Sequence, residues 1–536
     1  MTTGVARPEP AAWNQSRSAE RRVVESLDPA TGEVWRSHTV LGGSEVRGLM
    51  DVARRAHPAW AAMAVRERAR VLARFQRVLY GRRHEVADLI RRENGKAAPE
   101  ALATEVMVVL DLAATYAALA RRELVTRTLT PRNIALWRKR ASISYQPLGV
   151  VGVISPWNYP FMLPAGVILP ALVAGNAVLF KPSELTPSVG SLLVELLHEA
   201  GVPEGVMQLC TGDGATGAAL TDAAPDKVFF TGSVATGKRV ARACAERLIP
   251  CVLELGGSDP AIVLSDADIE NAASGIAWGR FSNAGQTCVA PKRAIVVDEV
   301  YDRFLAALAS VVGNLRVGPA SNPDNDVGPM IRPSQLDQIE EQLHDAIQRG
   351  ARVVVGGSTE GDGRRFFKPT VLADVTPDMR VMREETFGPL LPVIRVRDAN
   401  EAIAVANSSE FGLSASVWSR NSRRATEVAK RIEAGSVILN DAICGVGIAE
   451  VPHSGVKSSG HGSSHGLLGL LECVRPKVIV ADYLPSVRQP WWFGYDGSRR
   501  RQVDAFMRLW YGSSVRERAS GIAQTLKLVF RPSRPL

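Results

Sequence analysis

"VVGVISPWNYPFMLPAGV", residues 150–167, contains no charged side chain, and neither does the longer stretch from Ala141 to Phe180. A membrane-spanning helix would need about 20 uninterrupted apolar residues. Prolines interrupt this run and disfavour such a helix, at positions 156, 160, 164 and 170. The pattern instead predicts a buried strand, a turn, a short helix and a second buried strand.

Short apolar runs of this kind recur along the chain and alternate with amphipathic segments. The runs that resemble strands occupy residues 148–154, 176–180, 206–210, 226–230 and 252–255. Residues 44–125 place apolar side chains three and four positions apart, which is typical of helices. Strands that alternate with helices form parallel sheets, so we expect an α/β protein. The alternation resumes from about residue 256 to 455 and predicts a second α/β domain.

The remaining segments are of other kinds. Residues 138–147 and 472–482 alternate polar and apolar side chains and predict a projecting antiparallel hairpin. The polar, proline-bearing residues 1–22 lack the apolar segment of a signal peptide, and we expect a disordered tail there. A chain of 536 residues is long enough for two or three globular units.

The composition argues against several classes of protein. Apolar residues make up 46% of the chain and charged residues 22%, which is typical of a globular protein. None of the six cysteines forms a CxxC pair, so we expect a reducing cytoplasm and neither a disulfide framework nor a metal site. Residues 486–536 carry ten Arg or Lys and three Asp or Glu, which supplies +7 of the net charge of +9. Because the basic charge is local, we do not expect a nucleic-acid-binding protein.

Polar residues follow the predicted strands at their carboxyl ends, where parallel sheets bind ligands. Asn158 follows the first run, and its amide could donate to a developing oxyanion. An Asn at this place could equally cap the next helix. Lys181, Ser183 and Glu184 follow the second run and suit the hydroxyls of a ribose, although Ser and Glu are also expected in an ordinary helix cap.

Two glycine-containing turns could bind phosphate. Residues 212–217, GDGATG, match the pattern G-x-G-x-x-G, but 46 glycines in the chain make a chance match easy. Residues 229–241 run from a strand through Thr231, Gly232 and Ser233 into a helix, whose N-terminal amides attract pyrophosphate oxygens. The second turn is the better phosphate site, with Ser233 as an ordinary helix cap the alternative interpretation.

Two side chains could perform covalent or acid–base chemistry. Glu254 lies near the end of an apolar strand, where a carboxylate can act as a general base near neutral pH. Cys288 lies among small residues in FSNAGQTCVAP, and its thiolate could attack a carbonyl carbon. Each has a structural alternative, Glu254 as a buried group with a fixed partner and Cys288 as a small packed side chain.

Taken in order, PWNYP, KPSE, FTGS, ELGG, GQTC, EETFGP and VPHSGVKSSGHG resemble the motifs of the NAD(P)-dependent aldehyde dehydrogenase superfamily over about residues 25–482. The resemblance implies an aldehyde dehydrogenase-like α/β fold that binds NAD, with NADP possible. It implies a cytoplasmic homodimer or homotetramer. The implied parts are a Rossmann-type cofactor domain (23–124 and 147–255), a catalytic domain (256–455) and oligomerisation strands (125–146 and 472–485).

The resemblance also implies roles for individual residues. Cys288 would attack the aldehyde, and Asn158 with the backbone N–H of Cys288 would hold the oxyanion of the thiohemiacetal. After hydride transfer to the nicotinamide, Glu254 would activate the water that hydrolyses the thioester. The residues expected to bind the cofactor are Trp157, Lys181, Ser183, Glu184, Gly214, Ser233, Leu255, Glu385 and Phe387. A carboxylate at 184 accepts hydrogen bonds from a ribose 2′-OH and repels a 2′-phosphate, so we expect NAD to be preferred.

Two positions depart from the family pattern. Ser258 stands where the family motif ELGGK has lysine, and we expect little effect on the chemistry. His453 replaces an aromatic residue that often lines the substrate tunnel. The apolar segment 444–452, together with Met162 and Ala165, predicts a roomy tunnel for an aliphatic or aromatic aldehyde.

Other functions compete with oxidation of an apolar aldehyde. A succinate-semialdehyde-type enzyme is one alternative. A CoA-acylating relative is another, but that branch typically lacks the base that Glu254 supplies. A cofactor-independent cysteine hydrolase would leave FTGS and EETFGP without a purpose. A non-catalytic binding protein would not need Cys288, Glu254 and Asn158 together.

The C-terminal extension, residues 486–536, lies beyond the resemblance. It combines clustered arginines with the aromatic residues Trp491, Trp492, Trp510 and Tyr511. An aromatic and basic amphipathic segment can lie at an anionic membrane surface. Peripheral membrane contact is therefore one expectation, and packing on the oligomer with arginines facing water is the other.

Overall fold

The computed structural model describes residues 22–133, 136, 138–361, 365–486, 489, 491–493, 495 and 497–529. The expected N-terminal tail therefore lies outside the described residues, except Arg22, which pairs with Asp213 at 2.5 Å. The last seven residues of the C-terminal extension lie outside them too. The chain divides into two compact units: one runs to Ala120 and resumes over Leu148–Cys473, and the other joins Arg121–Pro147 to the chain from Val474 onward.

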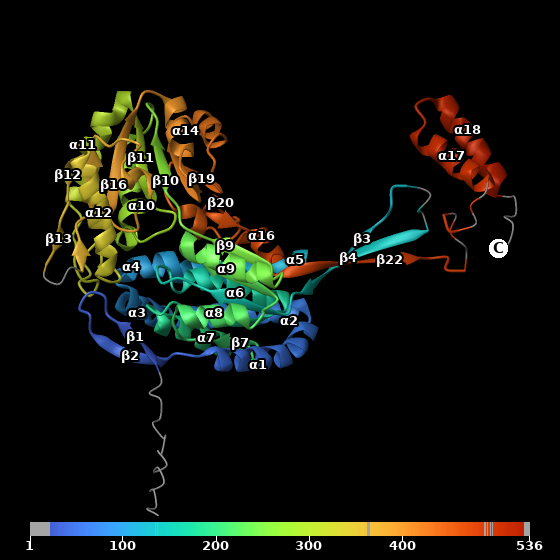
Figure 1. Ribbon diagram of the computed structural model, residues 1–536, viewed down its shortest axis with the longest axis horizontal. Helices are drawn as coiled ribbons and strands as arrows, with labels where there is room; N and C mark the ends of the chain where they lie inside the picture. Colours follow the sequence, from blue (N-terminus) through green and yellow to red (C-terminus); the bar gives the residue numbers. More distant parts are fainter. Residues whose placement is uncertain are drawn as a thin grey trace, which may run out of the picture. The chain divides into compact units, whose positions relative to one another are not determined.

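A six-stranded sheet in the order β21-β9-β8-β5-β6-β7 forms one half of the first unit (Figure 1). Its strands are β5 (Val150–Ile154), β6 (Ala177–Lys181), β7 (Met207–Leu209), β8 (Lys227–Thr231), β9 (Cys251–Glu254) and β21 (Gly460–His461). Only β21 is antiparallel to its neighbour in this sheet. The chain places β6 and β7 on one side of β5 and β8 and β9 on the other. The strand order thus reverses between β5 and β8, and ligands bind at the carboxyl ends of strands at such a reversal.

The uncharged stretch forms β5, a turn, helix α6 (Met162–Ala174) and β6, as predicted. Every residue of α6 is buried, which explains why no face of this helix is polar. Pro170 has no N–H to donate to the carbonyl of Gly166. The hydroxyl of Tyr116 donates to that carbonyl instead, at 3.3 Å. A proline-bearing helix is therefore accommodated in the core.

Helices surround this sheet, with the neighbouring strand pair β1 (Val23–Leu27) and β2 (Val34–Thr39). The helices are α1 (Gly43–Ala62), α2 (Val65–Gly81), α3 (Arg83–Asn94), α7 (Pro187–Glu199), α8 (Gly214–Asp222), α9 (Val234–Glu246) and α16 (Gly466–Leu471). A longer run joins α4 (Ala98–Ala101), a π-helical turn (Leu102–Val106) and α5 (Met107–Glu123). Among the described residues this run alone is long and apolar enough to cross a membrane, but 56% of its most apolar window is buried inside the protein. Its burial identifies it as a core helix.

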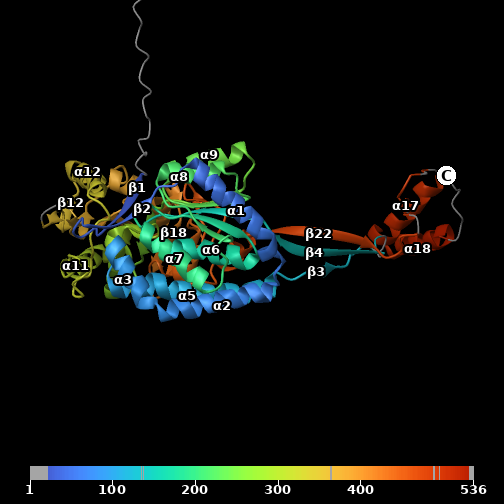
Figure 2. The same ribbon diagram turned by 90° about the horizontal axis from the view of Figure 1, so that it is seen from below.

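The other half of the first unit is a seven-stranded sheet in the order β12-β15-β16-β11-β10-β18-β19 (Figures 1 and 2). Its strands are β10 (Asp259–Val263), β11 (Pro291–Val297), β12 (Arg352–Val355), β15 (Thr370–Ala373), β16 (Leu390–Val396), β18 (Ser414–Trp418) and β19 (Ser436–Leu439). Only the β12–β15 pair is antiparallel. The helices of this half are α10 (Ile269–Phe281), α11 (Tyr301–Gly313), α12 (Ser334–Gln348), α13 (Arg380–Arg383), α14 (Ala399–Asn407) and α15 (Ser422–Ala429).

Two short strand pairs complete the first unit. They are β13 (Thr359–Glu360) with β14 (Phe366–Phe367), and β17 (Phe411–Gly412) with β20 (Val456–Lys457). A large buried cluster of aliphatic residues lies around the seven-stranded sheet, and Cys288 packs against it. The nucleophile predicted from the sequence therefore stands on the wall of a continuous core.

The second unit is a three-stranded antiparallel sheet followed by two helices. The strands are β3 (Arg127–Leu129), β4 (Lys139–Pro147) and β22 (Val474–Asp482), in the order β22-β4-β3. The two segments predicted to form a hairpin pair along their whole length, from Val474 opposite Pro147 to Asp482 opposite Lys139. The helices α17 (Gly497–Tyr511) and α18 (Val515–Val529) pack against each other.

Candidate active site

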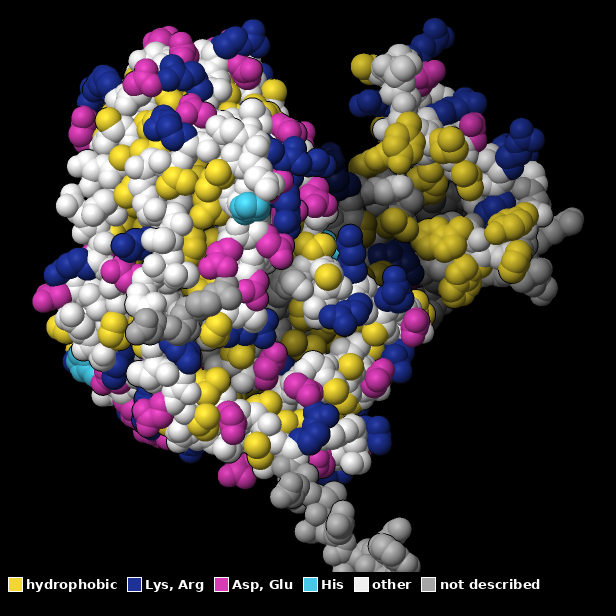
Figure 3. All heavy atoms as spheres, turned by 60° about the vertical axis from the view of Figure 1, so that its left-hand side comes forward, with side chains coloured by type: hydrophobic (Ala, Val, Ile, Leu, Met, Phe, Trp, Pro, Cys, Tyr) yellow, Lys and Arg dark blue, Asp and Glu magenta, His cyan; other side chains and the backbone are white. Residues whose placement is uncertain are grey.

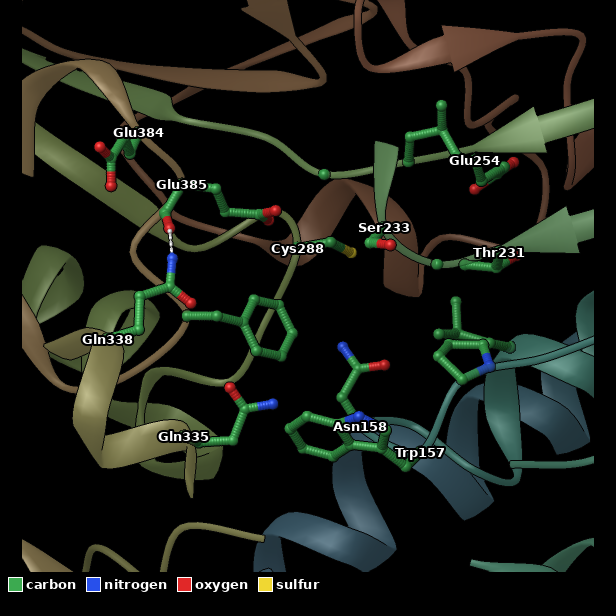
Figure 4. Close-up of a pocket in the computed structure, with 16 residues that line it drawn as sticks. Trp157, Asn158, Thr231, Ser233, Glu254, Cys288, Gln335, Gln338, Glu384 and Glu385 are labelled. Atoms are coloured by element: carbon green, nitrogen blue, oxygen red, sulfur yellow. Dashed lines mark hydrogen bonds between the residues drawn. The ribbon is translucent and has the colours of Figure 1, made fainter. Parts of the chain in front are cut away.

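A cavity of about 400 Å³ opens at the reversal point of the six-stranded sheet (Figure 4). The turns that follow β5, β8 and β9 form one wall, and α12 with the segment after α13 forms the other. The residues that line it are Pro156, Trp157, Asn158, Leu163, Thr231, Gly232, Ser233, Glu254, Leu255, Gly256, Cys288, Gln335, Gln338, Glu384, Glu385 and Phe387. The structure thus brings together residues that are up to 231 positions apart in the chain, from 156 to 387.

Cys288 also lines a second cavity, of about 280 Å³. The residues around this second cavity are Ala103, Thr104, Met107, Val108, Tyr159, Met162, Leu163, Trp278, Thr287, Cys288, Val289, Ile443, Cys444, Val446, Gly447 and Ile448. Only Cys288 and Leu163 belong to both linings. The thiol therefore stands where two cavities meet and is accessible from both.

Asn158 approaches Cys288 from the turn after β5 (Figure 4). Its side chain is buried, and Nδ2 donates to the carbonyl of Gln286 at 3.1 Å. A primary amide has two N–H bonds, so this contact uses one of them and the other can donate to a bound oxyanion. Helix α6 has Phe161 as its N-cap, so the alternative that Asn158 caps this helix is wrong.

The segment that carries Cys288 has a strained backbone. Asn283, Ala284 and Gly285 have φ angles of 51°, 53° and 73°, in the left-handed region that non-glycine residues avoid. Side-chain contacts fix this turn: the amide of Gln286 donates to the carbonyl of Asn283 at 2.9 Å, and its oxygen accepts from the N–H of Ile331 at 2.9 Å. The position of the nucleophile is thus set before any substrate binds.

The surroundings of Cys288 favour the neutral thiol. Burial raises the pKa of Cys288 to about 12, and the nearby Lys292 ammonium opposes this rise only in part. Lys292 is fully buried and donates to the carbonyl of Thr287 at 2.9 Å and to the carbonyl of Cys288. Lys292 therefore both holds the backbone of the nucleophile and supplies the nearest cation.

Glu385 lies on the opposite wall from Asn158 in Figure 4. Its carboxylate accepts the N–H of Gly257 at 3.1 Å and lies 3.9 Å from the ammonium of Lys292. Burial raises the pKa of Glu385 although that ammonium lowers it. A Cβ at Gly256 would come within 2.1 Å of the Glu385 carboxylate, so only glycine permits this approach.

Two aromatic residues predicted to bind the cofactor meet at the cavity. The rings of Trp157 and Phe387 lie edge to face, with centroids 5.5 Å apart and planes at 87°. The carbonyl of Trp157 accepts from the amide of Asn94 at 3.0 Å, which fixes the turn. The two rings form an apolar part of the cavity wall, next to the part formed by Glu384 and Glu385.

The predicted phosphate site lies in the first cavity, whereas the residues predicted to bind the adenosine ribose lie outside it. Ser233 and Leu255 line the cavity, and Ser233 is also the N-cap of α9, accepting from the N–H of Thr236 at 3.3 Å. The helix cap and the predicted phosphate site are therefore the same residue, at the N-terminus of α9. Lys181, Ser183, Glu184 and Gly214 are not among the lining residues.

Lys181 and Glu184 nevertheless form a pair at the carboxyl end of β6. Their Nζ and Oε2 atoms lie 3.1 Å apart, with Lys181 buried and Glu184 partly exposed. Burial raises the pKa of Glu184, but the Lys181 charge and hydrogen bonds outweigh burial and lower the pKa overall. Ser183 accepts from the N–H of Leu185, and Gly214 begins helix α8 in open space.

Glu254 ends β9 and lines the first cavity. Its Oε2 lies 3.3 Å from Nε2 of His453, and both side chains are buried. His453, which replaces an aromatic residue that often lines the substrate tunnel in the family, is in neither lining and contacts Glu254. An antiparallel bridge to Ser464 holds the backbone of His453.

The second cavity is apolar, as the composition of 444–452 predicted. None of its lining residues is charged. Met162 contributes to it, whereas the expectation for Ala165 is wrong: Ala165 is fully buried and belongs to neither lining. Three of the lining residues are also exposed to solvent and form an apolar opening of the cavity: Met107, Trp278 and Ile448.

Several residues of the site were missed in the sequence. Lys96 and Asn283 donate to the carbonyl of Asn158, at 3.2 Å and 2.9 Å. Lys292 contacts the backbone of Cys288, and Gln335 and Gln338 line the cavity from α12. No local signal singled out Lys96, which lies among other charged residues in RRENGKAAPE (91–100). Nothing local marks the two glutamines, which are ordinary polar residues of an amphipathic helix.

Comparison with known proteins agrees with this geometry. The sequence model described as "Aldehyde dehydrogenase family" matches residues 13–479. A 4,4'-diapolycopene aldehyde oxidase of a Methylomonas species is 40% identical over 489 residues, which cover 91% of each chain. An NADP-dependent succinate-semialdehyde dehydrogenase of Deinococcus radiodurans is 37% identical over 89% of this chain and 98% of its own. The solved structure of an NAD-dependent aldehyde dehydrogenase from Sinorhizobium meliloti has a TM-score of 0.84 at 34% identity, over 88% of this chain and 93% of its own.

Proposed function

The chain belongs to the aldehyde dehydrogenase family, and we propose that it oxidises an apolar aldehyde at Cys288 with NAD as its preferred hydride acceptor. The class of reaction is that of the family: an aldehyde becomes a carboxylic acid while NAD(P) is reduced. The choice of residues, of substrate class and of dinucleotide is our proposal. It rests above all on Cys288, which stands where a mixed polar cavity meets an apolar one.

The first cavity fits the nicotinamide half of a dinucleotide. The amides at the start of α9 can receive the pyrophosphate, and Ser233 lies at that point. Glu385 offers carboxylate oxygens to ribose hydroxyls, and Trp157 and Phe387 offer ring faces and edges to the nicotinamide. Leu255 completes this wall. The bound dinucleotide supplies the acceptor for the hydride that leaves the substrate carbon.

The adenosine half would lie outside that cavity, at the carboxyl end of β6. We assign Lys181, Ser183 and Glu184 to its ribose and Gly214 to the surroundings of its base. An ionised Glu184 accepts hydrogen bonds from ribose hydroxyls and repels a 2′-phosphate. The low pKa of Glu184 keeps it ionised at neutral pH, which supports a preference for NAD.

The residues of this chain then divide the acyl chemistry between them. Cys288 first loses its thiol proton to solvent, and the thiolate then attacks the aldehyde carbon. The oxyanion accepts hydrogen bonds from the Asn158 amide and the Cys288 backbone N–H. Once the thioester has formed, Glu254 takes a proton from the water that attacks it. The carbon–sulfur bond breaks, and the carboxylic acid and the Cys288 thiolate are released.

An apolar aldehyde suits the second cavity better than a semialdehyde acid. A carboxylate at the far end of the substrate would need a cation, because burying an unpaired charge is costly. No lining residue of that cavity is basic. The exposed apolar mouth at Met107, Trp278 and Ile448 lets a long chain extend outward. A relative named for the aldehyde of diapolycopene supports the same substrate class.

Steady-state rates with a panel of aldehydes test this assignment. We expect kcat/KM for decanal to exceed that for succinate semialdehyde by about 100-fold or more, since only the second must bury a carboxylate. A Cys288→Ala variant should produce no NADH with either aldehyde. A preference for the semialdehyde would contradict the substrate class, and NADH production by Cys288→Ala would contradict the mechanism.

The parts of the chain divide the remaining tasks. We assign residues 23–124 and 147–255 to cofactor binding, 256–455 to catalysis, and the strands within 125–146 and 472–485 to assembly of a homodimer or homotetramer. Strand β22 is an edge of its sheet and exposes three consecutive apolar side chains, Val478, Ile479 and Val480. An edge strand of this kind is a template for pairing with a second copy.

The C-terminal helices give a cytoplasmic enzyme a surface for contact with a membrane. Figure 3 shows hydrophobic side chains gathered on the C-terminal extension, and the described basic side chains of α17 and α18 are arginines. The exposed apolar residues of the C-terminal extension include Trp491, Trp492, Phe493 and Tyr495 before α17, and Met507, Trp510, Tyr511, Val515 and Ile522 in the two helices. Aromatic and basic side chains together match the interface of an anionic bilayer. Contact with a membrane would bring the enzyme to the phase in which apolar aldehydes dissolve.

A further inference from the structure

The carboxylate of Glu254 lies next to the imidazole of His453. Nε2 of His453 lies 3.3 Å from Oε2 of Glu254, with both side chains less than a tenth exposed. Two backbone hydrogen bonds to Ser464, of 2.7 Å and 2.9 Å, hold the histidine segment in place. The contact therefore joins two buried groups on fixed backbones.

The two oxygens of Glu254 have different environments. Oε2 faces the imidazole, whereas Oε1 is buried without a hydrogen-bond partner among the described residues. A buried acceptor without a partner costs about 1–3 kcal/mol, so it persists where it has a function. Glu254 lines the cavity that contains Cys288. The unpaired oxygen is thus suited to accept a proton from a water at the thioester.

An ionised carboxylate only accepts hydrogen bonds. At 3.3 Å the pair can therefore form a hydrogen bond only in the state in which Nε2 carries the hydrogen. The titratable groups around the pair are His465, Tyr116 and Cys288. Burial lowers the pKa of His465 to about 3 and raises the pKa of Tyr116, so both are neutral near pH 7.

We propose that His453 is a positioning residue for hydrolysis of the thioester: its Nε2–H holds Oε2 of Glu254, so that Oε1 faces the attacking water. This inference rests on the proposed function. In the step, the water oxygen bonds to the acyl carbon and its proton moves to Oε1. The carbon–sulfur bond then breaks, and Cys288 leaves as the thiolate. An apolar aromatic at position 453 could fill the same space but could not donate.

Separate measurement of the two half-reactions tests the proposal. Stopped-flow absorbance follows NADH formation, and intact-mass analysis of quenched enzyme measures the fraction of Cys288 held as thioester. For His453→Phe we expect an unchanged first turnover, thioester accumulation and hydrolysis slowed about tenfold to 100-fold, because a misdirected base loses that much. His453→Gln keeps an N–H donor and should stay within about threefold of the parent rate.

A variant pair and a matched control complete the test. In a Glu254→Gln background, His453→Phe should cause no further loss, because the group that it positions is gone. His461→Phe, at an exposed histidine of β21, should leave both half-reactions unchanged. Unchanged hydrolysis in His453→Phe would overturn the proposal, and so would equal losses in the Phe and Gln variants. A parent enzyme that forms no thioester would instead refute the proposed function.

Discussion

Lys96 and Glu105 form a salt bridge of 2.6 Å in which neither side chain is exposed to solvent. Both ends of this pair also hold the turn that carries Asn158. The ammonium of Lys96 donates to the carbonyl of Asn158 at 3.2 Å, and Oε2 of Glu105 accepts the N–H groups of Phe161 and Met162, at 2.9 Å and 3.1 Å. The buried Lys96–Glu105 pair thus fixes the turn that places the Asn158 side chain next to Cys288.

Removal of Lys96 should therefore affect both stability and catalysis. Lys96→Met leaves Glu105 as an uncompensated buried charge, and we expect the free energy of unfolding to fall by about 3–5 kcal/mol. Because the Asn158 carbonyl loses its donor, kcat should fall as well. Urea unfolding and steady-state rates measure the two effects. The exposed pair Lys368–Glu360 provides the control, since Lys368→Met should cost less than about 1 kcal/mol. Equal losses in the two variants would contradict this interpretation.

The reactivity of Cys288 should depend steeply on pH in the enzyme without cofactor. Because the pKa of Cys288 is raised to about 12, the thiolate fraction should increase about tenfold per pH unit from pH 7 to 10, with no plateau. Alkylation by iodoacetamide, followed by peptide mass analysis, measures the rate. Cys251 is an internal comparison, since a hydrogen bond from Cys244 lowers its pKa. A plateau for Cys288 below pH 9 would show that the thiol is activated before the cofactor binds.

Lys292 should account for part of the remaining reactivity of Cys288. Its ammonium lowers the pKa of Cys288, so Lys292→Met should raise that pKa further and slow alkylation at pH 9 by about tenfold. Lys292→Arg keeps the charge and should lose less. Thermal unfolding of each variant identifies any that fail to fold. Faster alkylation in Lys292→Met would reverse the assigned sign.

The choice of dinucleotide should depend on Glu184. Replacing Glu184 by Ala removes the charge that repels a 2′-phosphate, and we expect kcat/KM for NADP to rise about tenfold while that for NAD falls. Glu410→Ala, at an exposed carboxylate of the first unit, is the control. Initial rates with the two dinucleotides provide the comparison. A parent enzyme that already favours NADP would contradict the preference that we propose.

The fold and the reacting residues could be predicted because their signals are local. An uncharged run such as 150–167 can only be buried, and the alternation of such runs with helices defines a parallel sheet. Asn158, Glu254 and Cys288 lie within short motifs that resemble those of the aldehyde dehydrogenase superfamily, and this resemblance implied that they act together; the structure brings all three to one cavity.

The supporting residues could not be predicted because their partners are distant in the chain. His453 contacts Glu254, which lies 199 positions earlier. The backbone of His453 forms a bridge with Ser464, a contact that no short motif indicates. Ala165 was expected to line the substrate tunnel, but it is fully buried and does not line the cavity that Met162 lines. Short motifs identify the reacting groups, and long-range packing decides what holds them.

Contact with a membrane should depend on aromatic side chains of the C-terminal extension. In the full-length protein we expect a Trp492→Glu, Phe493→Glu double variant to bind vesicles of phosphatidylglycerol about tenfold more weakly than the parent, because both aromatic residues lose their burial in the interface. The control is Leu248→Glu, which replaces an exposed apolar side chain of the first unit by a carboxylate and should leave binding to the vesicles unchanged. Co-sedimentation with vesicles measures all three proteins.

The basic side chains should contribute through charge alone. Replacement of Arg499, Arg500 and Arg501 by Glu should abolish the preference for anionic over neutral vesicles. A salt concentration of about 0.5 M should weaken the binding of the parent protein to anionic vesicles in the same way, because the Debye length falls to about 4 Å. Decanal oxidation in solution should be unchanged in these variants, since the α17 residues lie in neither active-site lining. If the parent binds no vesicles while the variants change its oligomeric state, the extension serves assembly, and the aromatic face of α17–α18 packs against a second copy.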